Sequence, residues 1–500
     1  MRTEPGSQPI TWGTPAARWV LLATVAGSGL AFLDGTTVNV ALPAIGADLD
    51  ADIAGLQWVL NAYLLALAAL IPLAGSLADH FGRRRIFQLG VVWFAAASLL
   101  CGVAPSDELL SLARGLQGVG GALLTPGSLA ILQASFAPSD RAKAIGAWSG
   151  LSGIAAAVGP LVGGWLIDAL SWRWIFFINL PLAAAVIMIT ARHVPESRDP
   201  LAPRGFDIPG AVLVAAGLGA ISWSLISAGT AGFGPGQLGL LAAGVAALVG
   251  FVAVQARSPH PMLPLSLFAS RQFTGANVAT LAVYAALSGM MFLVVIFLQE
   301  VAGYSALEAG AALLPVTALM LLFSARAGAL AERIGPRWPM TFGPLIMAVG
   351  MLLLLRLTAD GSYLTTVLPA VLVFGAGLTL TVAPLTATVL AGVPDRHSGI
   401  ASAVNNALSR GAGLLAVAVV PVAAGITGAA YQDPVRLADG FRTAMLICAG
   451  LVAAGGLAAA VLVRNRLAPD LPGCPTSELH RQYHCAVDGP PIEPQQVTRG

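Results

Sequence analysis

The chain has 500 residues, of which 57% are hydrophobic and 10% are charged, and its mean hydropathy is +0.80. Soluble domains carry about 25% charged residues, so the composition excludes a soluble domain and predicts a protein that crosses the bilayer many times. The net charge of +2 gives no sign of a nucleic-acid partner, and we expect none.

The chain begins with a short polar segment, residues 1–18, which lacks the compact apolar core and cleavage site of a signal peptide. We expect it to be a cytoplasmic tail. Fourteen apolar runs of membrane-spanning length follow. They are residues 19–43, 56–77, 86–104, 109–134, 142–166, 174–191, 208–229, 236–256, 273–299, 306–328, 339–357, 363–391, 399–427 and 441–463.

The basic residues of the loops predict the orientation of these spans. An even number of spans places both termini on one side of the membrane, and that side is rich in basic residues: Arg83, Arg84, Arg85, Arg141, Lys143, Arg192, Arg198, Arg204, Arg257, Arg271, Arg333, Arg337, Arg396, Arg464 and Arg466. The opposite loops keep Arg173, Arg356, Arg436 and Arg442. Because cytoplasmic loops carry the excess of Lys and Arg, we expect a multi-pass protein of the cytoplasmic membrane with both termini in the cytoplasm.

Two Pro-rich charged stretches, residues 192–206 and 257–273, bracket spans seven and eight and leave six spans on either side. The two sides also echo each other, since GSLADHFGRRR (75–85) follows the second span and GALAERIGPRW (328–338) follows the second span of the later set. A repeat of this kind places a binding site at the midplane between halves that move by alternating access. The expected domains are residues 1–18, a tail; 19–191, a six-helix bundle; 192–272, linkers with two extra helices; 273–463, a second six-helix bundle; and 464–500, a disordered cytoplasmic tail.

Five stretches in chain order resemble motifs of the major facilitator superfamily, and specifically of its fourteen-helix drug:proton antiporters. They are LDGTTVNVALP (33–43), GSLADHFGRRR (75–85), RGLQGVGGA (114–122), GPLVGG (159–164) and WRWIFFINLP (172–181). The chain departs from these patterns at His80, where a basic residue is usual, and at Ala155, where a glycine often stands. The resemblance implies an all-α membrane protein with the major facilitator fold: two six-helix bundles plus two extra central helices.

The stretch Ala147–Pro181, which begins inside the fifth span, is crowded with glycines. In a bilayer, glycine faces let neighbouring helices approach closely, and a proline can occupy a bend. We therefore predict a packing helix with a hinge, which by resemblance is the antiporter motif: Gly159, Pro160, Gly163 and Gly164.

Asp34 and Arg114 are the candidates for proton coupling. Asp34 lies 16 residues beyond Arg18, about 24 Å along a helix and past the midplane. A charged carboxylate is costly there, so Asp34 can take up and release a proton when water reaches it from alternate sides. The alternative is a structural aspartate that is hydrogen-bonded to Thr36, Thr37 or Asn39.

Arg114 stays charged inside span four and must face a polar interior. By resemblance it neighbours the proton site, where it would favour the ionised carboxylate. The alternative is a structural partner of Gln117 or of backbone carbonyls.

The loop after span two is the candidate cytoplasmic gate, formed by Gly75, Asp79, Gly82, Arg83 and Arg84. Asp79 can pair with a nearby arginine or meet the positive N-terminus of a helix of the second half, and the arginines can hold the loop at the anionic leaflet. The alternative is ordinary positive-inside topology, which explains the arginines but neither Asp79 nor the glycines.

Polar and aromatic residues within the spans are candidates for a substrate pocket. The candidates are Phe32, Asn39, Trp58, Tyr63, Gln117, Asn405, Asn406 and Arg410. For Arg410, helix packing with some substrate contact is the favoured interpretation. Other aromatics, Trp148, Trp223, Tyr284 and Phe292, could line the pocket or face lipid. Glu300, Glu308 and Asp168 are expected at solvated loop edges, with gating as the alternative.

The remaining features indicate neither an enzyme nor a metalloprotein. Cys474, His480, His484 and Cys485 in the tail match no zinc signature, and the four cysteines, with Cys101 and Cys448, are too scattered for a disulfide framework. The sequence has no P-loop and no catalytic constellation. We therefore expect no cofactor or metal, and a proton gradient as the energy source.

Three functions stay open at this stage. The resemblance and Asp34 favour proton-driven efflux of lipophilic or amphipathic small molecules such as antibiotics. Proton-coupled uptake or export of a specific metabolite on the same fold is the alternative, and a non-transporting receptor is the third; such a receptor would not need Asp34 or Arg114 in apolar helices. We expect a monomer in the bilayer whose partners are protons and a small-molecule substrate.

Overall fold

The structure is a computed structural model, which describes residues 10–137, 139–198, 205–393, 398–428, 431 and 433–465. Within these ranges it is all-α, with a single isolated β-bridge between Ile10 and Phe136 and no strand. Fourteen of its helical segments are long and apolar enough to cross a membrane. This confirms the predicted number of spans.

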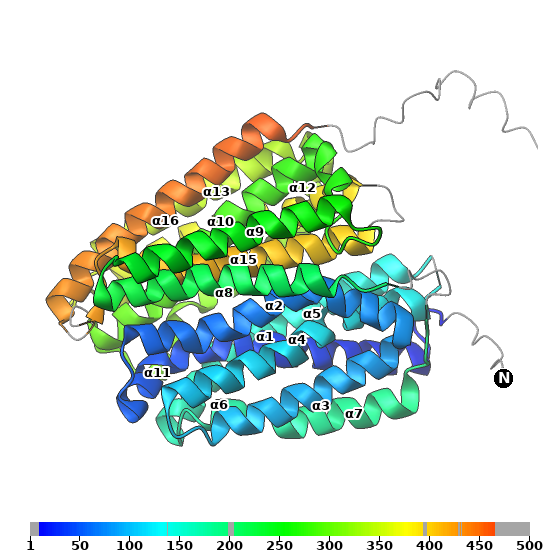
Figure 1. The fold of residues 1–500 in the computed structure, drawn as a ribbon, viewed down its shortest axis with the longest axis horizontal. Coiled ribbons are helices and arrows are strands. Elements are labelled where there is room, and N and C mark those ends of the chain that lie inside the picture. Colours follow the sequence, from blue (N-terminus) through cyan, green and yellow to red (C-terminus); the bar gives the residue numbers. More distant parts are fainter. Residues whose placement is uncertain are drawn as a thin grey trace, which may run out of the picture. The chain divides into compact units, whose positions relative to one another are not determined.

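The helices run alongside one another (Figure 1). Those of the first half are α1 (Pro15–Leu49), α2 (Ile53–Phe81), α3 (Arg83–Gly102), α4 (Asp107–Ser135), α5 (Arg141–Ala169), α6 (Trp174–Phe177) and α7 (Asn179–His193). Two helices follow, α8 (Ile208–Ala231) and α9 (Pro235–Arg257), and then the short η1 (Leu265–Ala269). The second half has α10 (Arg271–Glu300), α11 (Ala306–Ala312), α12 (Leu314–Ile334), α13 (Arg337–Leu353), η2 (Leu354–Arg356), η3 (Tyr363–Val367), α14 (Leu368–Ala391), α15 (Ser398–Ala423) and α16 (Pro434–Leu462).

Local sequence signals set the helix ends. The side chains of Asp52, Ser106 and Ser270 accept hydrogen bonds from the first free backbone N–H groups of α2, α4 and α10. The largest difference from the predicted spans is at α16, which begins at Pro434 and not at residue 441. Asp433 caps this helix and Pro434 suits its first turn, so the helix starts in a polar segment that hydropathy alone does not include.

Apolar side chains cover the outside of the helices as well as the inside. Leu112, Val249 and Val461 are 68%, 64% and 71% exposed. A lipid environment accounts for such exposure, since apolar side chains that face lipid are not in contact with water. Cys101 and Cys448 are buried free thiols.

Glycines bring neighbouring helices together in both halves. A Cβ at Gly120 of α4 would lie 2.6 Å from the backbone N of Phe94 in α3, and a Cβ at Gly350 of α13 would lie 2.6 Å from the backbone N of Phe374 in α14. Small residues permit such close approach between membrane helices. The third and fourth spans of each half therefore pack through the same kind of glycine–phenylalanine contact.

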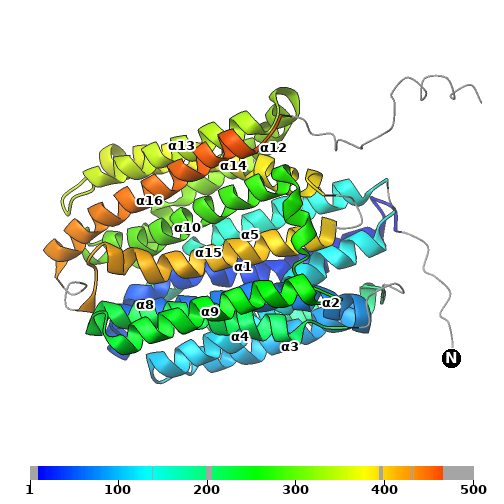
Figure 2. The ribbon, with the colours of Figure 1, turned by 45° about the horizontal axis from the view of Figure 1, so that its top comes forward.

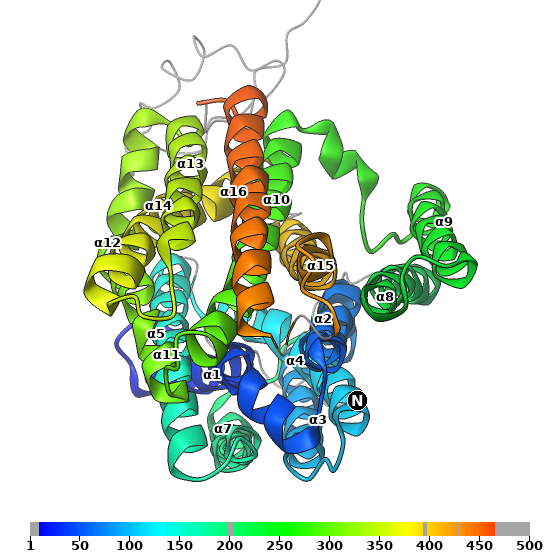
Figure 3. The ribbon, with the colours of Figure 1, turned by 90° about the vertical axis from the view of Figure 1, so that its left-hand side faces the viewer.

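The pair α8 and α9 is central in the sequence but lies at one side of the helices (Figure 2; Figure 3). Helix α8 contacts both α2 of the first half and α15 of the second half, whereas α9 contacts α8. Asp207 joins the two helices at one end. Its carboxylate accepts hydrogen bonds from the Gly210 N–H at the start of α8 at 2.9 Å and from Gln255 Nε2 of α9 at 2.5 Å. Only 11% of the α9 span is buried, so its sides face outward.

Close helix packing at Gly120 gives the first prediction. We expect Gly120→Val to lower the thermal unfolding midpoint of the purified protein, because the added side chain meets the α3 backbone. Overpacking of this kind costs about 1–3 kcal/mol. Gly150→Val is the matched control, since no atom of the described residues lies within 4 Å of a Cβ there. Equal midpoints for both variants would contradict this packing.

Candidate functional site

Asp34 of α1 and Arg114 of α4 form an ion pair that is fully buried inside the first half. Arg114 Nη1 lies 2.6 Å from Asp34 Oδ2, and Gln117 Nε2 donates to Asp34 Oδ1 at 2.8 Å. Both carboxylate oxygens are therefore engaged by side chains of α4. The structure brings together the two residues that were predicted for proton coupling.

Further contacts hold the guanidinium in place. Arg114 Nε donates to the Val59 carbonyl at 3.1 Å, and Nη1 also donates to Gln117 Oε1 at 2.5 Å. The ring of Tyr63 lies 4.3 Å from the guanidinium carbon, a distance suited to a cation–π contact. Nη2 is buried and has no hydrogen-bond partner among the described residues. Arg114 therefore pairs with Asp34 and also bonds to Gln117 and a backbone carbonyl, so the two roles considered for it occur together.

Two polar residues of the site were missed from the sequence. Ser98 of α3 accepts hydrogen bonds from Gln117 Nε2 at 2.7 Å and from Asn179 Nδ2 at 3.2 Å. Asn179, at the start of α7, also lies 3.5 Å from Asp34 Oδ1. Asn179 lies in the WRWIFFINLP motif, where an amide inside an apolar run could have indicated a buried polar site. A lone serine such as Ser98 gives no such indication.

The proposed structural partners of Asp34 bond elsewhere. The Thr36 and Thr37 hydroxyls donate to the Leu33 carbonyl at 3.0 and 2.6 Å, and Asn39 Nδ2 donates to the Gly35 carbonyl at 2.9 Å. These are bonds within α1, so Asp34 depends on α4 for its compensation. Protonation of Asp34 would remove the negative charge that Arg114 faces and would weaken the contact between α1 and α4.

The glycines of α5 face two directions, and α5 is a continuous helix through Pro160. Gly159 and Gly163 lie against Thr36 and Thr37 of α1, with no room for a side chain. The Thr37 hydroxyl also donates to the Gly159 carbonyl at 3.2 Å. One face of the predicted motif therefore packs α5 on the helix that carries Asp34.

The other face of α5 meets the second half, in what we call the α5–α11 contact. A Cβ at Gly164 would lie 2.5 Å from the Cα of Leu307, and Gly310 lies against the Pro160 carbonyl. Asp168 accepts hydrogen bonds from the backbone N–H groups of Ala306 at 3.3 Å and Leu307 at 3.0 Å. Asp168 is exposed, as expected of a loop edge, but it also joins the two halves, which sequence reasoning did not favour.

The α5–α11 contact lies at the end of the bundle opposite to the start of α1. We call the end where α1 begins and α16 ends the terminal end. Two bonds between the halves accompany the contact: Gln299 Nε2 donates to the Val40 carbonyl at 3.0 Å, and Gln57 Nε2 donates to the Val417 carbonyl at 2.6 Å.

The predicted gate lies at the terminal end. The polar contacts of its described residues are with the first half and the segment directly after α7. Arg83 Nη2 lies 2.7 Å from Asp79 Oδ1, and the Arg84 N–H donates to Glu196 Oε1 at 3.1 Å. Gly82 has a φ of 113°, and a Cβ there would lie 2.7 Å from Glu196 Oε1. Glu196, which sequence reasoning missed, thus binds at the N-terminus of α3, where a carboxylate is favourable.

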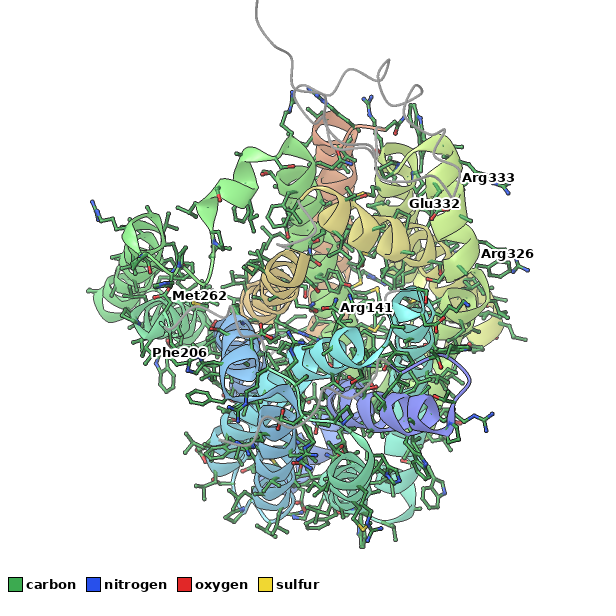
Figure 4. All side chains as sticks on the ribbon, turned by 90° about the vertical axis from the view of Figure 1, so that its right-hand side faces the viewer. Arg141, Phe206, Met262, Arg326, Glu332 and Arg333 are labelled. Carbon is green, nitrogen blue, oxygen red and sulfur yellow. The ribbon has the colours of Figure 1, made fainter. Side chains whose placement is uncertain are left out.

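Figure 4 views the structure from the terminal end. Arg141, at the start of α5, lies between the helices of the two halves, whereas Arg326 and Arg333 of α12 point outward from the edge. In the described part of the chain, no hydrogen bond or ion pair links Asp79, Arg83 or Arg84 to the second half. A Cβ at Gly75, the remaining predicted gate residue, would lie 3.9 Å from the Cβ of Pro126 in α4.

The pocket candidates of the first half are scattered. Tyr63 is buried beneath Arg114 and Gln117 is part of the ion-pair network, while Phe32 and Asn39 are partly buried on α1. The Trp58 ring lies 5.4 Å from that of Trp223, which joins α2 to α8.

The candidates of the second half lie on α15. Asn405 Nδ2 donates to Asn277 Oδ1 at 3.0 Å and to the Thr280 hydroxyl at 2.7 Å, both on α10, whereas Asn406 Nδ2 donates to the Ser402 carbonyl of its own helix. Arg410 is partly buried, and its Nε is fully buried without a hydrogen-bond partner among the described residues.

Within the described ranges, no group of three or more His, Cys, Asp or Glu side chains is placed to hold a metal ion. Cys474, His480, His484 and Cys485 lie outside the described residues. The basic loop residues Arg204, Arg396 and Arg466 also lie outside them.

Comparison with known proteins gives a family and several relatives. The model of the Major Facilitator Superfamily matches residues 24–417. The chain is 36% identical over 474 residues to the puromycin resistance protein pur8 of Streptomyces alboniger, covering 92% of this chain and 93% of that protein. It is 36% identical over 403 residues to the tetracenomycin C resistance and export protein of Streptomyces glaucescens, covering 80% of this chain and 75% of that protein.

Solved structures resemble the chain in fold alone. The POT family transporter PepTSo has a TM-score of 0.65 at 14% identity, covering 89% of this chain and 97% of its own. A D-xylose-proton symporter has a TM-score of 0.64 at 15% identity, covering 90% of this chain and 98% of its own. The predicted major facilitator fold, with its fourteen spans, is therefore confirmed.

The buried ion pair gives the second prediction. We expect Arg114→Met to lower the unfolding free energy by about 3 kcal/mol, because it leaves a buried carboxylate without its partner. The double variant Asp34→Asn with Arg114→Met should recover most of this loss. Unfolding of the purified variants measures both values, and a double variant as unstable as the sum of the two single variants would show that the pair is not coupled.

The α5–α11 contact gives the third prediction. We expect Gly164→Val to separate the two halves at this end, since its side chain meets the backbone at Leu307. Spin labels at the exposed Leu170 and Val435, one in each half, should report longer distances. Gly153→Val is the control, because no described atom lies within 4 Å of a Cβ at Gly153. Unchanged distances in Gly164→Val would rule out a closing role for the contact.

Proposed function

The chain belongs to the major facilitator superfamily, and on that premise we propose that it exports lipophilic or amphipathic small molecules, antibiotics among them, in exchange for protons. The superfamily is one of transporters and not of enzymes. The energy source is the proton gradient, without a bound cofactor.

The relatives carry the export part of this proposal. Proteins with about a third of their residues identical over most of the chain are named for resistance to or export of puromycin and tetracenomycin C. The multidrug efflux pump LfrA of Mycolicibacterium smegmatis is a further relative, 35% identical over 400 residues, which covers 79% of each chain. Shared residues over such lengths favour the same direction of transport.

The Asp34–Arg114 pair supports the proton part. In this proposal Asp34 binds a proton when one end of the bundle is open and releases it when the other end is open, and Arg114 favours release because it stabilises the carboxylate. In the described chain, Asp34 is the one carboxylate that lies deep within a span and is paired with a buried arginine. A carboxylate inside the membrane is functional by default.

The contacts between the halves support alternating access. The basic loops favour a terminal end in the cytoplasm. The α5–α11 contact then closes the outer end, while no hydrogen bond or ion pair joins the described gate residues to the second half. Transport to the outside then requires the α5–α11 contact to break and Asp79 with its arginines to engage the second half. The protein acts as a monomer in the cytoplasmic membrane, with both termini inside the cell.

The fourth prediction tests this function. In inverted membrane vesicles with an acid interior, addition of a drug from a panel of anionic, neutral and cationic lipophilic compounds should trigger proton efflux through the wild-type protein. Asp34→Asn should abolish this efflux, because an amide cannot carry the proton. Asp50→Asn is the matched control: Asp50 is exposed and has a φ of 52°, a conformation that asparagine tolerates.

The possible results separate the alternatives. Proton efflux that survives in Asp34→Asn would move the coupling site to another carboxylate, with Glu300 and Glu308 next in line. A wild-type protein that moves no protons with any drug would favour a specific metabolite as its substrate. In both cases the vesicles must contain equal amounts of folded protein.

A further inference from the structure

Arg410 is an uncompensated positive charge in the middle of a membrane-spanning helix. It lies one residue from the centre of the Gly399–Ala423 span. Its Nε is fully buried and unpaired, and Arg410 forms no hydrogen bond or ion pair with any residue that the structure describes. Arg114, in α4, has Asp34 as its partner. Arg410 is partly buried, and a charge in the middle of a span is costly without a partner, so its retention needs an explanation.

The contacts of α15 place Arg410 on the face that meets the other helices of the interior. Asn405 bonds to Asn277 and Thr280 of α10, and a Cβ at Gly413 would lie 2.6 Å from Ser288 Oγ of the same helix. Arg410 lies between these two levels, and so does Tyr284 on α10.

The same region of α15 also meets the first half. Val417 accepts the hydrogen bond from Gln57 of α2, and Gly413 lies 3.8 Å from Leu64, measured from its Cβ position. Tyr63, the residue before Leu64, is the one whose ring lies under Arg114. Arg410 therefore lies on a segment of α15 that meets the first half.

The balance of charge there is positive. Asp34 is the one carboxylate in the interior of a described span, because the others, such as Asp79, Asp168 and Glu300, lie near helix ends. Asp34 and Arg114 compensate each other, so Arg410 leaves one net positive charge near the middle of its span. A guanidinium binds a carboxylate through two parallel N–H donors and also stacks on aromatic rings.

We propose that the transported substrate carries an ionised acidic group, which binds to Arg410 where α15 meets α10 and α2. The acidic group supplies the negative charge that Arg410 lacks among the described residues, and apolar side chains of the same interface, such as Leu64, contact the body of the molecule. This inference rests on the proposed export function, because it describes the substrate class of the same central site. It differs from the general expectation of lipophilic compounds in requiring an anion.

Binding of three matched probes to the purified full-length protein tests the proposal. Anthracene-2-carboxylate, anthracene-2-carboxamide and 2-(aminomethyl)anthracene share one ring system and are anionic, neutral and cationic at pH 7. We expect the wild-type protein to bind the carboxylate about 10- to 100-fold more tightly than the carboxamide, the range that charged hydrogen bonds provide. Arg410→Gln should remove this preference and leave the carboxamide affinity unchanged.

Arg326→Gln is the matched control. Arg326 also lies within a spanning helix, but it is exposed and donates to the Leu322 carbonyl of its own helix. It should keep the preference for the carboxylate. Equal binding of carboxylate and carboxamide by the wild-type protein, tighter binding of the cation, or an unchanged preference in Arg410→Gln would each overturn the proposal.

A stability measurement separates a binding role from a structural one. Without ligand, Arg410→Met should unfold at the same temperature as the wild-type protein or at a higher one, because removal of a partly buried charge that has no partner relieves a cost. A fall as large as that in Arg114→Met would mean that Arg410 supports the fold, and would overturn the proposal. Anion binding without drug-triggered proton movement would instead count against the proposed exchange mechanism alone, whereas proton-coupled export restricted to neutral or cationic drugs would overturn the anion proposal alone.

Discussion

A charge within apolar helices is costly without a partner, and the pairing of Asp34 with Arg114 organises the interior of the first half. Asp34 is compensated by Arg114 and Gln117 from α4, and the same network reaches Ser98 of α3 and Asn179 of α7. With the Val59 carbonyl of α2, which accepts from Arg114 Nε, one ion pair connects five helices of the first half. Because each member satisfies another, a change of charge at Asp34 alters contacts on all five helices.

The glycines of α5 connect this network to the second half. Gly159 and Gly163 pack on α1, which carries Asp34, and Gly164 packs on α11. A rigid helix that contacts both partners closely can transmit a displacement of α1 to the contact between the halves. The absence of side chains at these positions is what allows both contacts within two turns of one helix.

Much of this arrangement could be predicted from the sequence, and the reasons for the rest are physical. The spans, the repeat and the Asp34–Arg114 pair follow from hydropathy and from the cost of charge in a bilayer, both of which are local properties. Glu196 and Asp168 could not be assigned, because their partners are backbone N–H groups of α3 and α11, which are far away in sequence. The side-on position of α8 and α9 was equally hidden, since hydropathy identifies spans but not their neighbours.

The position of α8 has a consequence for movement within the membrane. Leu218 of α8 lies beside Gly411 of α15, and Leu65 of α2 lies beside Gly219 of α8. Larger side chains fill the same contacts, since the Trp58 and Trp223 rings join α2 to α8 and Leu218 packs in one cluster with Leu414 of α15. Because α8 contacts a helix of each half, any tilt of α2 relative to α15 has to change the packing of α8 on one of them. The hairpin of α8 and α9 is therefore mechanically coupled to the relative movement of the halves, although it belongs to neither of them.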